Sequence, residues 1–450
     1  MKDPTLDFAS ILPTVGNFAF TAAAFIVALS VIVAIHEYGH YIVGRWSGIH
    51  AEVFSLGFGP TVWSRVDKRG TKWQIAALPF GGYVKFLGDA DAASGKDGEA
   101  ISSLTDAERR HTMHGAPLWA RFLTVLAGPV FNFILAIIVF TGLILAEGIS
   151  TYPPQIETLH SLPEGVSELA EGDRLVAIEG VALPDEKGYG DFLEALPIQP
   201  QLSYTVLRGG QEVTVSGPPL SPTRVDAVTP GWGADKAGIH VDDVILEIGG
   251  EMVFEFGQMI PLINKSAGKP TVIKLWRDGK ILEVTIQAQK RDLPIADNQF
   301  ETRYIMGVQG SLFFSSARER PGIGEALRLG GKGTWRVVTQ SISGLYHMVA
   351  GKISSCNLSG PVGIANLSGQ LARQGFLRFI YFIAMLSTAV GLMNLFPIPV
   401  LDGGHLVFFV YEAVTGKPPH DKALQILMTV GLALILMLMA FALFNDFACP

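Results

Sequence analysis

The string His36-Glu37-Tyr38-Gly39-His40 places two metal-binding side chains and an acid close together in the chain. Residues four apart on a helix share one face, so His36 and His40 would both reach one Zn²⁺ ion. Glu37 stands beside them, where a carboxylate would take a proton from water at the metal. Such a string also arises by chance in soluble proteins, so its surroundings decide how much it means.

The surrounding residues, 18–43, are otherwise mostly Ala, Val, Ile, Leu and Phe. An ionisable group inside a bilayer costs about 2.5–3.5 kcal/mol on insertion scales, so such groups are normally functional. The alternative is a helix end at the membrane interface with incidental histidines. That alternative leaves three ionisable groups at ligand spacing unexplained. The pattern therefore predicts a metal site within the membrane.

A third metal ligand is expected elsewhere in the chain, because catalytic zinc takes three protein ligands and keeps one position open. Asp402 is the best candidate, because it is an ionisable residue late in a span expected to run in the same direction as the first, and so at the same membrane depth. Pro397 and Pro399 break helical hydrogen bonding just before it. His405 is a rival ligand, because histidine is a common zinc ligand. Asn394 would hydrogen-bond a substrate backbone, and an ordinary contact between helices is the alternative.

The composition indicates a membrane protein with several spans. The chain has 450 residues, 49% of them hydrophobic, and its mean hydropathy is positive. The net charge is −7 and no basic stripe is present, which argues against a nucleic-acid partner. Crossing a bilayer needs about 20 apolar residues. Four segments meet this length, namely residues 18–43, 119–145, 376–396 and 424–444.

The distribution of Lys and Arg predicts the orientation of these spans, because basic loops stay in the cytoplasm. Basic residues gather between the first and second spans and between the third and fourth. Both termini and the long segment between spans two and three would then lie outside. The first span lacks the basic start of a signal peptide, so we expect it to be retained. Both metal-ligand motifs would meet near the cytoplasmic surface.

The outer segment contains an internal repeat with an offset of about 70 residues. Residues 172–180 return as 242–250, and the hairpin signal after Arg208 returns after Arg277. The opening of the second copy, 229–239, resembles the pattern of PDZ domains, which bind extended peptides at a sheet edge. The first copy departs from this opening. Two β domains without ligands are the alternative.

Other segments have weaker signals. The glycine-rich runs 54–60 and 73–88 are too short to span a membrane, and they fit strands at the membrane edge or an ordinary β-hairpin. The polar stretch 89–116 predicts a flexible cytoplasmic loop. Residues 324–352 predict one or two amphipathic helices, and residues 359–363 predict a turn before the third span.

Together, the intramembrane His-Glu-x-x-His string, the later Asn-x-x-Pro-x-Pro-x-Leu-Asp-Gly-Gly-His segment and the two PDZ-like units resemble bacterial site-2 proteases. The resemblance covers essentially the whole chain. It includes the run Gly81-Gly82-Tyr83-Val84-Lys85 and the run Gly128-Pro129-Val130-Phe131-Asn132.

This resemblance implies a zinc endopeptidase of the bacterial inner membrane that acts in regulated intramembrane proteolysis. Its partners would be the lipid bilayer and single-span membrane proteins, such as anti-sigma factors trimmed outside and remnant signal peptides. The implied zinc ligands are His36, His40 and Asp402, and Glu37 is the implied catalytic base. The implied substrate-binding residues are Asn394, Gly81, Gly82, Tyr83, Val84 and Lys85, the last five as a strand edge.

We therefore expect a polytopic α-helical membrane protein with about four transmembrane helices, a membrane-associated β-hairpin region and two periplasmic PDZ-like α+β domains. The expected domains are residues 1–150 with the first two spans, 151–220 and 221–292 as PDZ-like domains, 293–370 as periplasmic helices and a connection, and 371–450 with the last two spans.

Two other functions fit parts of the sequence. A zinc transporter would use the same ligands, but it needs ionisable residues across the outer leaflet, where the first span has only Thr21 and Ser30 as polar groups. An inactive scaffold that binds partners through the PDZ-like pair predicts that Glu37 is dispensable. The sequence leaves open whether the pair binds peptides or excludes bulky substrates. It also leaves open whether Cys356 pairs with Cys449.

Overall fold

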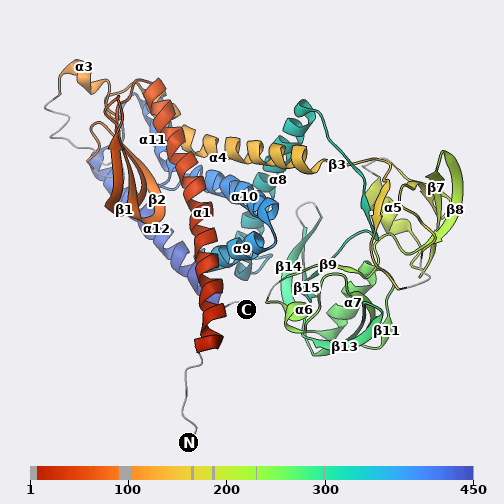
Figure 1. Cartoon of the computed structure of the whole chain (residues 1–450). Helices are drawn as coiled ribbons and strands as arrows, with labels where there is room; N and C mark the ends of the chain where they lie inside the picture. Colours follow the sequence, from red (N-terminus) through yellow and green to blue (C-terminus); the bar gives the residue numbers. More distant parts are fainter. Residues whose placement is uncertain are drawn as a thin grey trace, which may run out of the picture. The chain divides into compact units, whose positions relative to one another are not determined.

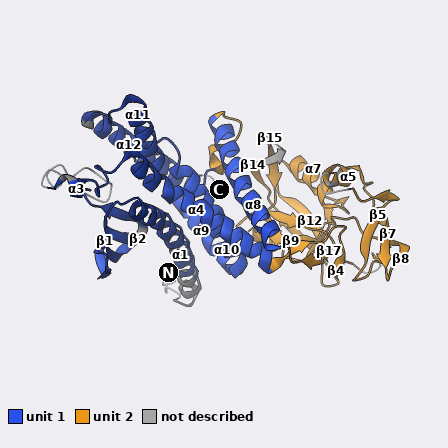
Figure 2. Cartoon of the chain, turned by 90° about the horizontal axis from the view of Figure 1, so that it is seen from above, with its two compact units in different colours: residues 1–146, 322–349, 358–450 blue, residues 147–321, 350–357 orange. Residues whose placement is uncertain are grey.

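The protein is represented by a computed structural model that describes residues 8–90, 104–163, 167–184, 188–229, 231–296 and 299–448. Two compact units divide the chain (Figures 1 and 2). Unit 1 comprises Met1–Ala146, Gly322–Val349 and Leu358–Pro450, and unit 2 comprises Glu147–Pro321 and Ala350–Asn357. Every candidate site residue lies in unit 1, and the internal repeat lies in unit 2.

Unit 1 contains the candidate transmembrane helices. Within the described part of the chain, four helices are long and apolar enough to cross a bilayer. They coincide with the four predicted stretches, and lipid favours helices there because all their backbone hydrogen bonds are internal. These helices are α1 (Phe8–Trp46), α4 (Leu118–Glu147), α10 (Phe376–Asn394) and α12 (Asp421–Ala448).

The helical path is interrupted between α10 and α11 (Asp402–Thr415). Proline has no backbone N–H and restricts the residue before it, so Pro397 and Pro399 end the first helix. Val400 has a φ of 125°, a strained conformation for a β-branched residue. The chain then re-enters a helix at Asp402, which places this carboxylate on the first turn of α11.

One long helix, α8 (Ile323–Val349), forms where the sequence predicts one or two. It packs on α4 and α10 around Ala136, Phe140 and Ala384, with Val337 of α8 alongside. A Cβ atom on Gly330 of α8 would be 3.0 Å from the carbonyl oxygen of Ile137 in α4, so these two helices approach closely.

A further helix, α9 (Pro361–Arg373), begins inside the stretch that we predicted as a turn, so that prediction was wrong. The carboxylate of Asp446, at the end of α12, accepts the backbone N–H groups of Gly360, Val362 and Gly363 at 2.8–3.1 Å. These are amides that a helix N-terminus leaves without internal partners. The helix was missed because its capping residue lies more than 80 residues away in the chain.

The glycine-rich runs form one antiparallel hairpin of two long strands, β1 (Ala51–Val66) and β2 (Lys72–Phe86). Both strands bend, so residues 51–56 pair with 82–86 on one side and with 72–75 on the other. Residues 61–66 pair with 72–76. The hairpin is therefore arranged as four short strand segments side by side, and residues 82–86 form one edge of it.

The polar stretch after this hairpin is partly ordered, which corrects the expectation of a flexible loop across all of it. Residues 91–103 lie outside the described residues. After them, α3 (Asp106–Arg109) is capped by Thr105, and the buried Met113 donates its N–H to Leu87. Backbone hydrogen bonds therefore tie residues 111–113 to the two ends of the hairpin.

Unit 2 contains two four-stranded sheets with the same strand order, β6-β5-β7-β8 and β11-β10-β12-β13. One helix separates the second and third strands of each copy. The first copy has β5 (Arg174–Ile178), β6 (Val181–Ala182), α5 (Tyr189–Ala195), β7 (Leu202–Arg208) and β8 (Gln211–Gly217). The second has β10 (Val244–Ile248), β11 (Glu251–Met252), α7 (Phe256–Ser266), β12 (Thr271–Arg277) and β13 (Lys280–Ile286).

The two copies also share an ion pair between an arginine and a buried aspartate. Arg208 donates from Nε and Nη2 to the Asp173 carboxylate at 2.7 Å, and Arg277 donates in the same way to Asp243 at 2.6 Å. Each aspartate is fully buried and also accepts a backbone N–H from three residues earlier. The repeat is thus preserved in side-chain contacts as well as in strand order.

Shorter strands surround these sheets. Strand β17 (Phe314–Ser316) pairs with β4 (Ile156–Leu159), and β16 (Val308–Gly310) pairs with β9 (Val225–Val228). The segment between the repeat and α8 therefore folds with the repeat as strands, and the helices expected over residues 293–370 are α8 and α9. The remaining elements are β3 (Ile149–Ser150), α6 (Gly233–Lys236), β14 (Gln289–Ala296), β15 (Gln299–Ile305), β18 (Arg318–Glu319) and a 3₁₀ turn at Ser355–Asn357.

Candidate metal centre

Helix α1 places two imidazole side chains on one face. The ring centroids of His36 and His40 are 4.8 Å apart, and their Nε2 atoms are 3.2 Å apart. This convergence follows from helix geometry, because residues four apart are stacked one turn above another. The string therefore has the arrangement that its spacing predicts.

Helix α11 brings a carboxylate to the same point. The Oδ2 atom of Asp402 is 3.2 Å from Nε2 of His36 and 3.5 Å from Nε2 of His40. Within the described residues, these three are the only His, Cys, Asp or Glu side chains that gather as a group able to hold a metal ion. His405, the rival ligand in the sequence, lies one helical turn further along α11 and is not part of this group.

The three atoms fit a zinc ion. Tetrahedral zinc with bonds of about 2.0–2.1 Å separates its ligand atoms by about 3.3 Å, and the observed separations are 3.2, 3.2 and 3.5 Å. Oδ2 of Asp402 is buried and makes no hydrogen bond of good geometry to a described residue. Two imidazoles and one carboxylate also leave the fourth position of a catalytic zinc site free.

Glu37 lies outside this group and faces the edge of β2. A Cβ atom built on Gly82 would be 3.1 Å from Cγ of Glu37, so the strand touches the acid at a position where only glycine fits. The acid therefore contacts the edge formed by residues 82–86 and directly follows His36 in the chain.

The other predicted substrate-binding residues are placed less directly. Gly81 has a φ of 121° at the bend of β2. The ring of Phe58 fills the space that a side chain at position 81 would need. The hydroxyl of Tyr83 accepts a hydrogen bond from Gln74 at 3.2 Å, and Lys85 is 3.2 Å from Glu52. These side chains make contacts within the hairpin, so their backbone is what the edge offers to a ligand.

Asn394 is the last residue of α10, at the point where the helix breaks. Its Nδ2 donates to the carbonyl of Val390 at 3.1 Å, within its own helix. The alternative for Asn394 was a contact with another helix. In the described structure its side chain makes no hydrogen bond to another helix. A role in substrate binding stays a prediction.

The turn that joins β1 to β2 is held by one carboxylate outside the spans. Desolvation raises the pKa of Asp67, but N–H groups of Arg69, Trp73 and Thr71 and the charge of Arg45 outweigh it, so the pKa lies below its usual value. The ionised form is thus stabilised near pH 7. This turn fixes the register of the hairpin whose far edge faces Glu37.

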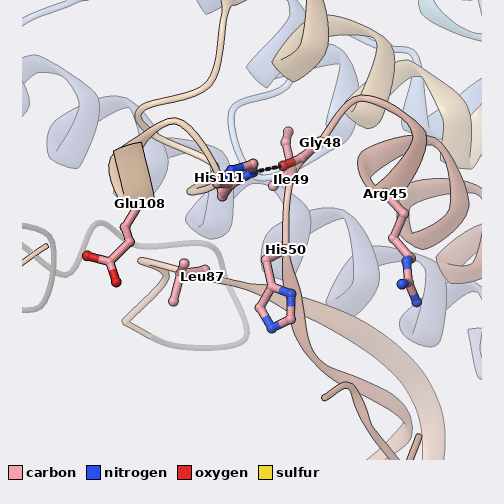
Figure 3. A pocket seen from close by; sticks show the side chains of 7 residues that line it. All are labelled: Arg45, Gly48, Ile49, His50, Leu87, Glu108 and His111. Carbon is pink, nitrogen blue, oxygen red and sulfur yellow. Dashed lines mark hydrogen bonds between the residues drawn. The ribbon is translucent and has the colours of Figure 1, made fainter. Parts of the chain in front are cut away.

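An open pocket of 360 Å³ lies at the C-terminal end of α1, where the ring of His111 bonds the carbonyl of Gly48 (Figure 3). Its lining residues are Arg45, Gly48, Ile49, His50, Leu87, Glu108 and His111. None of the three residues that gather as a metal site lines it. The pocket is therefore separate from the metal centre.

Helix α4 contributes contacts to which the sequence assigned no role. The carbonyl oxygen of Thr124 is 2.8 Å from Nδ1 of His40, and the side-chain amide of Asn132 is 3.2 Å from Nδ1 of His36. The run Gly128-Pro129-Val130-Phe131-Asn132 was the available signal, since it belongs to the family resemblance. The spacing of residues could not predict this contact, because Asn132 and His36 lie 96 residues apart in the chain.

Comparison with known proteins agrees with this geometry. The model of peptidase family M50 matches residues 24–438. Proteins named as zinc metalloproteases in Rhizobium meliloti (strain 1021) and Agrobacterium fabrum are each 34% identical, over 96% and 97% of this chain and 97% and 98% of theirs. Regulator of sigma-E protease RseP of Escherichia coli (strain K12) is 29% identical over 96% of this chain and 99% of its own.

Proposed function

The chain belongs to peptidase family M50, the site-2 proteases, and on this premise we propose that it cleaves single-span membrane proteins inside the bilayer. Membership makes it a zinc metalloendopeptidase of a bacterial membrane. The observation that carries the proposal is the triangle of His36, His40 and Asp402, together with the contact of the neighbouring Glu37 with a strand edge at Gly82.

In this proposal the triangle holds zinc and Glu37 moves protons. Zinc supplies a Lewis acid when bound, which polarises a carbonyl and acidifies water. The Glu37 carboxylate accepts a proton from the attacking water and later delivers it to the leaving amine. His36 and His40 orient their Nε2 atoms toward the metal, and Asp402 balances part of its charge.

The edge at residues 82–86 would hold the substrate as an added strand. A transmembrane helix keeps its carbonyls in internal hydrogen bonds, so it must unwind before cleavage. Pairing with a strand edge offsets part of that cost. Gly82 places this edge against Glu37, so a peptide paired with it would pass the acid. Asn394 stands at the broken end of α10, where it would contact the same peptide.

The substrates proposed are anti-sigma factors already trimmed outside and remnant signal peptides. The printed name of the Escherichia coli relative, a regulator of sigma-E protease, supports the first class. The basic loops support a metal centre near the cytoplasmic side of the inner membrane and a periplasmic location of unit 2. The repeat copies, residues 151–220 and 221–292, would act there as PDZ-like domains for peptide ligands.

Cleavage of a single-span substrate tests the proposal. Glu37→Gln should keep zinc and lose cleavage, because it removes the proton acceptor but no ligand. His36→Ala and Asp402→Asn should lose zinc and cleavage together. Zinc is measured by metal analysis of protein purified in detergent, and cleavage by the appearance of the two fragments. Cleavage at the normal rate by the Glu37→Gln protein would refute the mechanism.

Orientation is tested with epitope tags in two exposed turns. A tag after Gly279, in the hairpin of the second repeat copy, should bind an antibody added to intact spheroplasts. A tag after Arg69, in the β1–β2 turn, should bind only after the membrane is opened. The reverse pattern would refute the proposed orientation while leaving the metal centre unaffected.

A further inference from the structure

One face of α4 runs behind the two histidines of α1. Thr124, Gly128 and Asn132 are spaced four residues apart on α4, so they share one side of that helix. A Cβ atom on Gly128 would be 2.3 Å from Nε2 of His40 and 2.8 Å from Cε1 of His36. Only glycine fits at this crossing, and it lets Thr124 and Asn132 on either side reach the Nδ1 atoms of the two rings.

The histidine that faces Thr124 is oriented by a backbone carbonyl. Nδ1 of His40 lies 2.8 Å from the Thr124 oxygen, which can only accept a hydrogen bond. The proton must therefore be on Nδ1, and in the neutral ring, the form that binds a metal, Nε2 then keeps its lone pair. Metal-binding histidines are commonly fixed in this way, through a hydrogen bond from the ring nitrogen that does not bind the metal.

The ring of His36 should likewise donate a hydrogen bond from Nδ1, in this case to the side chain of Asn132. If Nε2 binds a metal, Nδ1 carries the proton and requires an acceptor. The amide of Asn132 is 3.2 Å away with Nδ2 toward the ring, while its Oδ1 is buried without a hydrogen-bond partner among the described residues. A half-turn of the amide exchanges Oδ1 and Nδ2 at nearly the same positions. Oδ1 then accepts the Nδ1 proton, so two donors no longer face each other and the oxygen gains a partner, while Nδ2 takes the position that Oδ1 had.

We propose that Asn132 is a positioning residue of the metal centre, whose Oδ1 accepts the Nδ1–H of His36 and fixes the ring with Nε2 toward the metal. This inference rests on the proposed role of His36 as a zinc ligand. It assigns to α4 a function that its apolar sequence conceals, namely to set the tautomer of both histidines.

Asn132 is itself held firmly. It is completely buried, and its backbone carbonyl accepts the hydroxyl of Ser387 in α10 at 3.0 Å. Gly391, one turn further along α10, would place a Cβ atom 3.1 Å from Cβ of Asn132. The side chain therefore has little freedom to move, as a residue that orients a ligand requires.

Three substitutions separate positioning from packing. Asn132→Leu keeps the volume and removes the acceptor, so zinc affinity should fall about 10- to 100-fold. Asn132→Asp keeps an acceptor and should bind zinc within about threefold of the parent protein. Thr334→Val in α8 is the matched control, because it removes a buried hydroxyl hydrogen bond, to the carbonyl of Gly330 at 3.1 Å, within a helix that carries neither Asn132 nor the two histidines of the metal centre. It should lower thermal stability and leave zinc affinity unchanged.

Zinc affinity is measured by competition with a chromogenic chelator in detergent, and the absorption spectrum of the Co²⁺-substituted protein reports any change in ligand arrangement. Zinc affinity of Asn132→Leu equal to that of the parent protein would refute the positioning role, as would a tenfold loss in Asn132→Asp. If Asn132→Leu does not fold, Asn132→Ala replaces it with the same expected loss. If His36→Ala binds zinc normally, the proposed function fails instead, so the two failures are distinguishable.

Discussion

Gly82 of β2 lies against Glu37 of α1 so closely that a Cβ atom at position 82 would be 3.1 Å from the Glu37 Cγ. The same Cβ would be 2.7 Å from the carbonyl oxygen of Ser55 and 2.9 Å from Cγ1 of Val33. Such distances leave no space for a side chain. The proposed base and the proposed substrate edge are therefore in direct contact.

Replacing Gly82 with alanine should impair proteolysis while sparing the metal. The new methyl group must push the strand away from α1, and small misplacements of reacting groups cost up to about 100-fold in rate. We expect kcat/KM on a single-span substrate to fall at least about tenfold with zinc content unchanged. Gly142→Ala in α4 is the control, because nothing lies within 4 Å of a Cβ there. Equal activities of the two variants would contradict the proposed contact.

The ion pair between Arg121 of α4 and Glu412 of α11 should hold the helix that begins with Asp402. Its two hydrogen bonds measure 2.6 and 3.0 Å, and both side chains are largely buried. Glu412→Gln should lower the free energy of unfolding by about 2 kcal/mol, as expected for hydrogen bonds to charged groups. It should also weaken zinc binding, because Asp402 is less firmly placed.

Thermal unfolding in detergent and zinc titration measure these two effects. The control is Glu325→Gln, which breaks the exposed pair between Glu325 and Arg328 and should cost at most about 0.5 kcal/mol. A stability loss in Glu412→Gln without any change in zinc affinity would show that α11 keeps Asp402 in place without this pair.

Asp446 should control the order of α9. Its two oxygens accept three backbone N–H groups, and its negative charge lies at the positive end of the helix dipole. Asp446→Asn keeps one acceptor oxygen and loses the charge, so we expect a loss of about 1 kcal/mol. Hydrogen exchange of residues 361–373 should accelerate, while exchange in α4 stays constant as the internal reference. Unchanged exchange in α9 would contradict the capping role.

The first repeat copy should lose stability in acid through Asp173. Burial raises the pKa of this carboxyl, but the hydrogen bonds from Arg208 and Ala170 and the charge of Arg208 outweigh it and lower the pKa below its ordinary value. A lowered pKa in the folded state contributes stability above the unfolded value, near 3.9, and that contribution disappears as pH falls through the folded value.

Asp173→Asn removes this contribution. Because the Arg208 side chain is 39% exposed, solvent weakens the pair, and we expect a loss of about 1–2 kcal/mol at pH 7. The difference between parent and variant should stay constant from pH 7 to 5 and shrink below pH 4. Hydrogen exchange of β5 and β7 across this range measures it. A difference that grows on acidification would contradict the assigned pair.

Local patterns in the sequence determined the parts that depend on local geometry. Helical spacing alone made His36 and His40 converge, and the lengths of four apolar stretches predicted α1, α4, α10 and α12. The internal repeat predicted two similar folds, which have the same strand order. In each case the signal is periodic or continuous in the chain, so it is available without tertiary contacts.

Tertiary structure alone decided which distant residues meet. It gathered Asp402, which the sequence favoured over His405, with the two histidines, placed Asn132 behind His36, and supplied the cap of α9 from Asp446. The physical reason is that a membrane helix is apolar on every side, so its sequence does not mark the face that packs. Its rotation is set by close contacts between small residues, such as Gly128 against His40, and those contacts exist only after the helices are assembled.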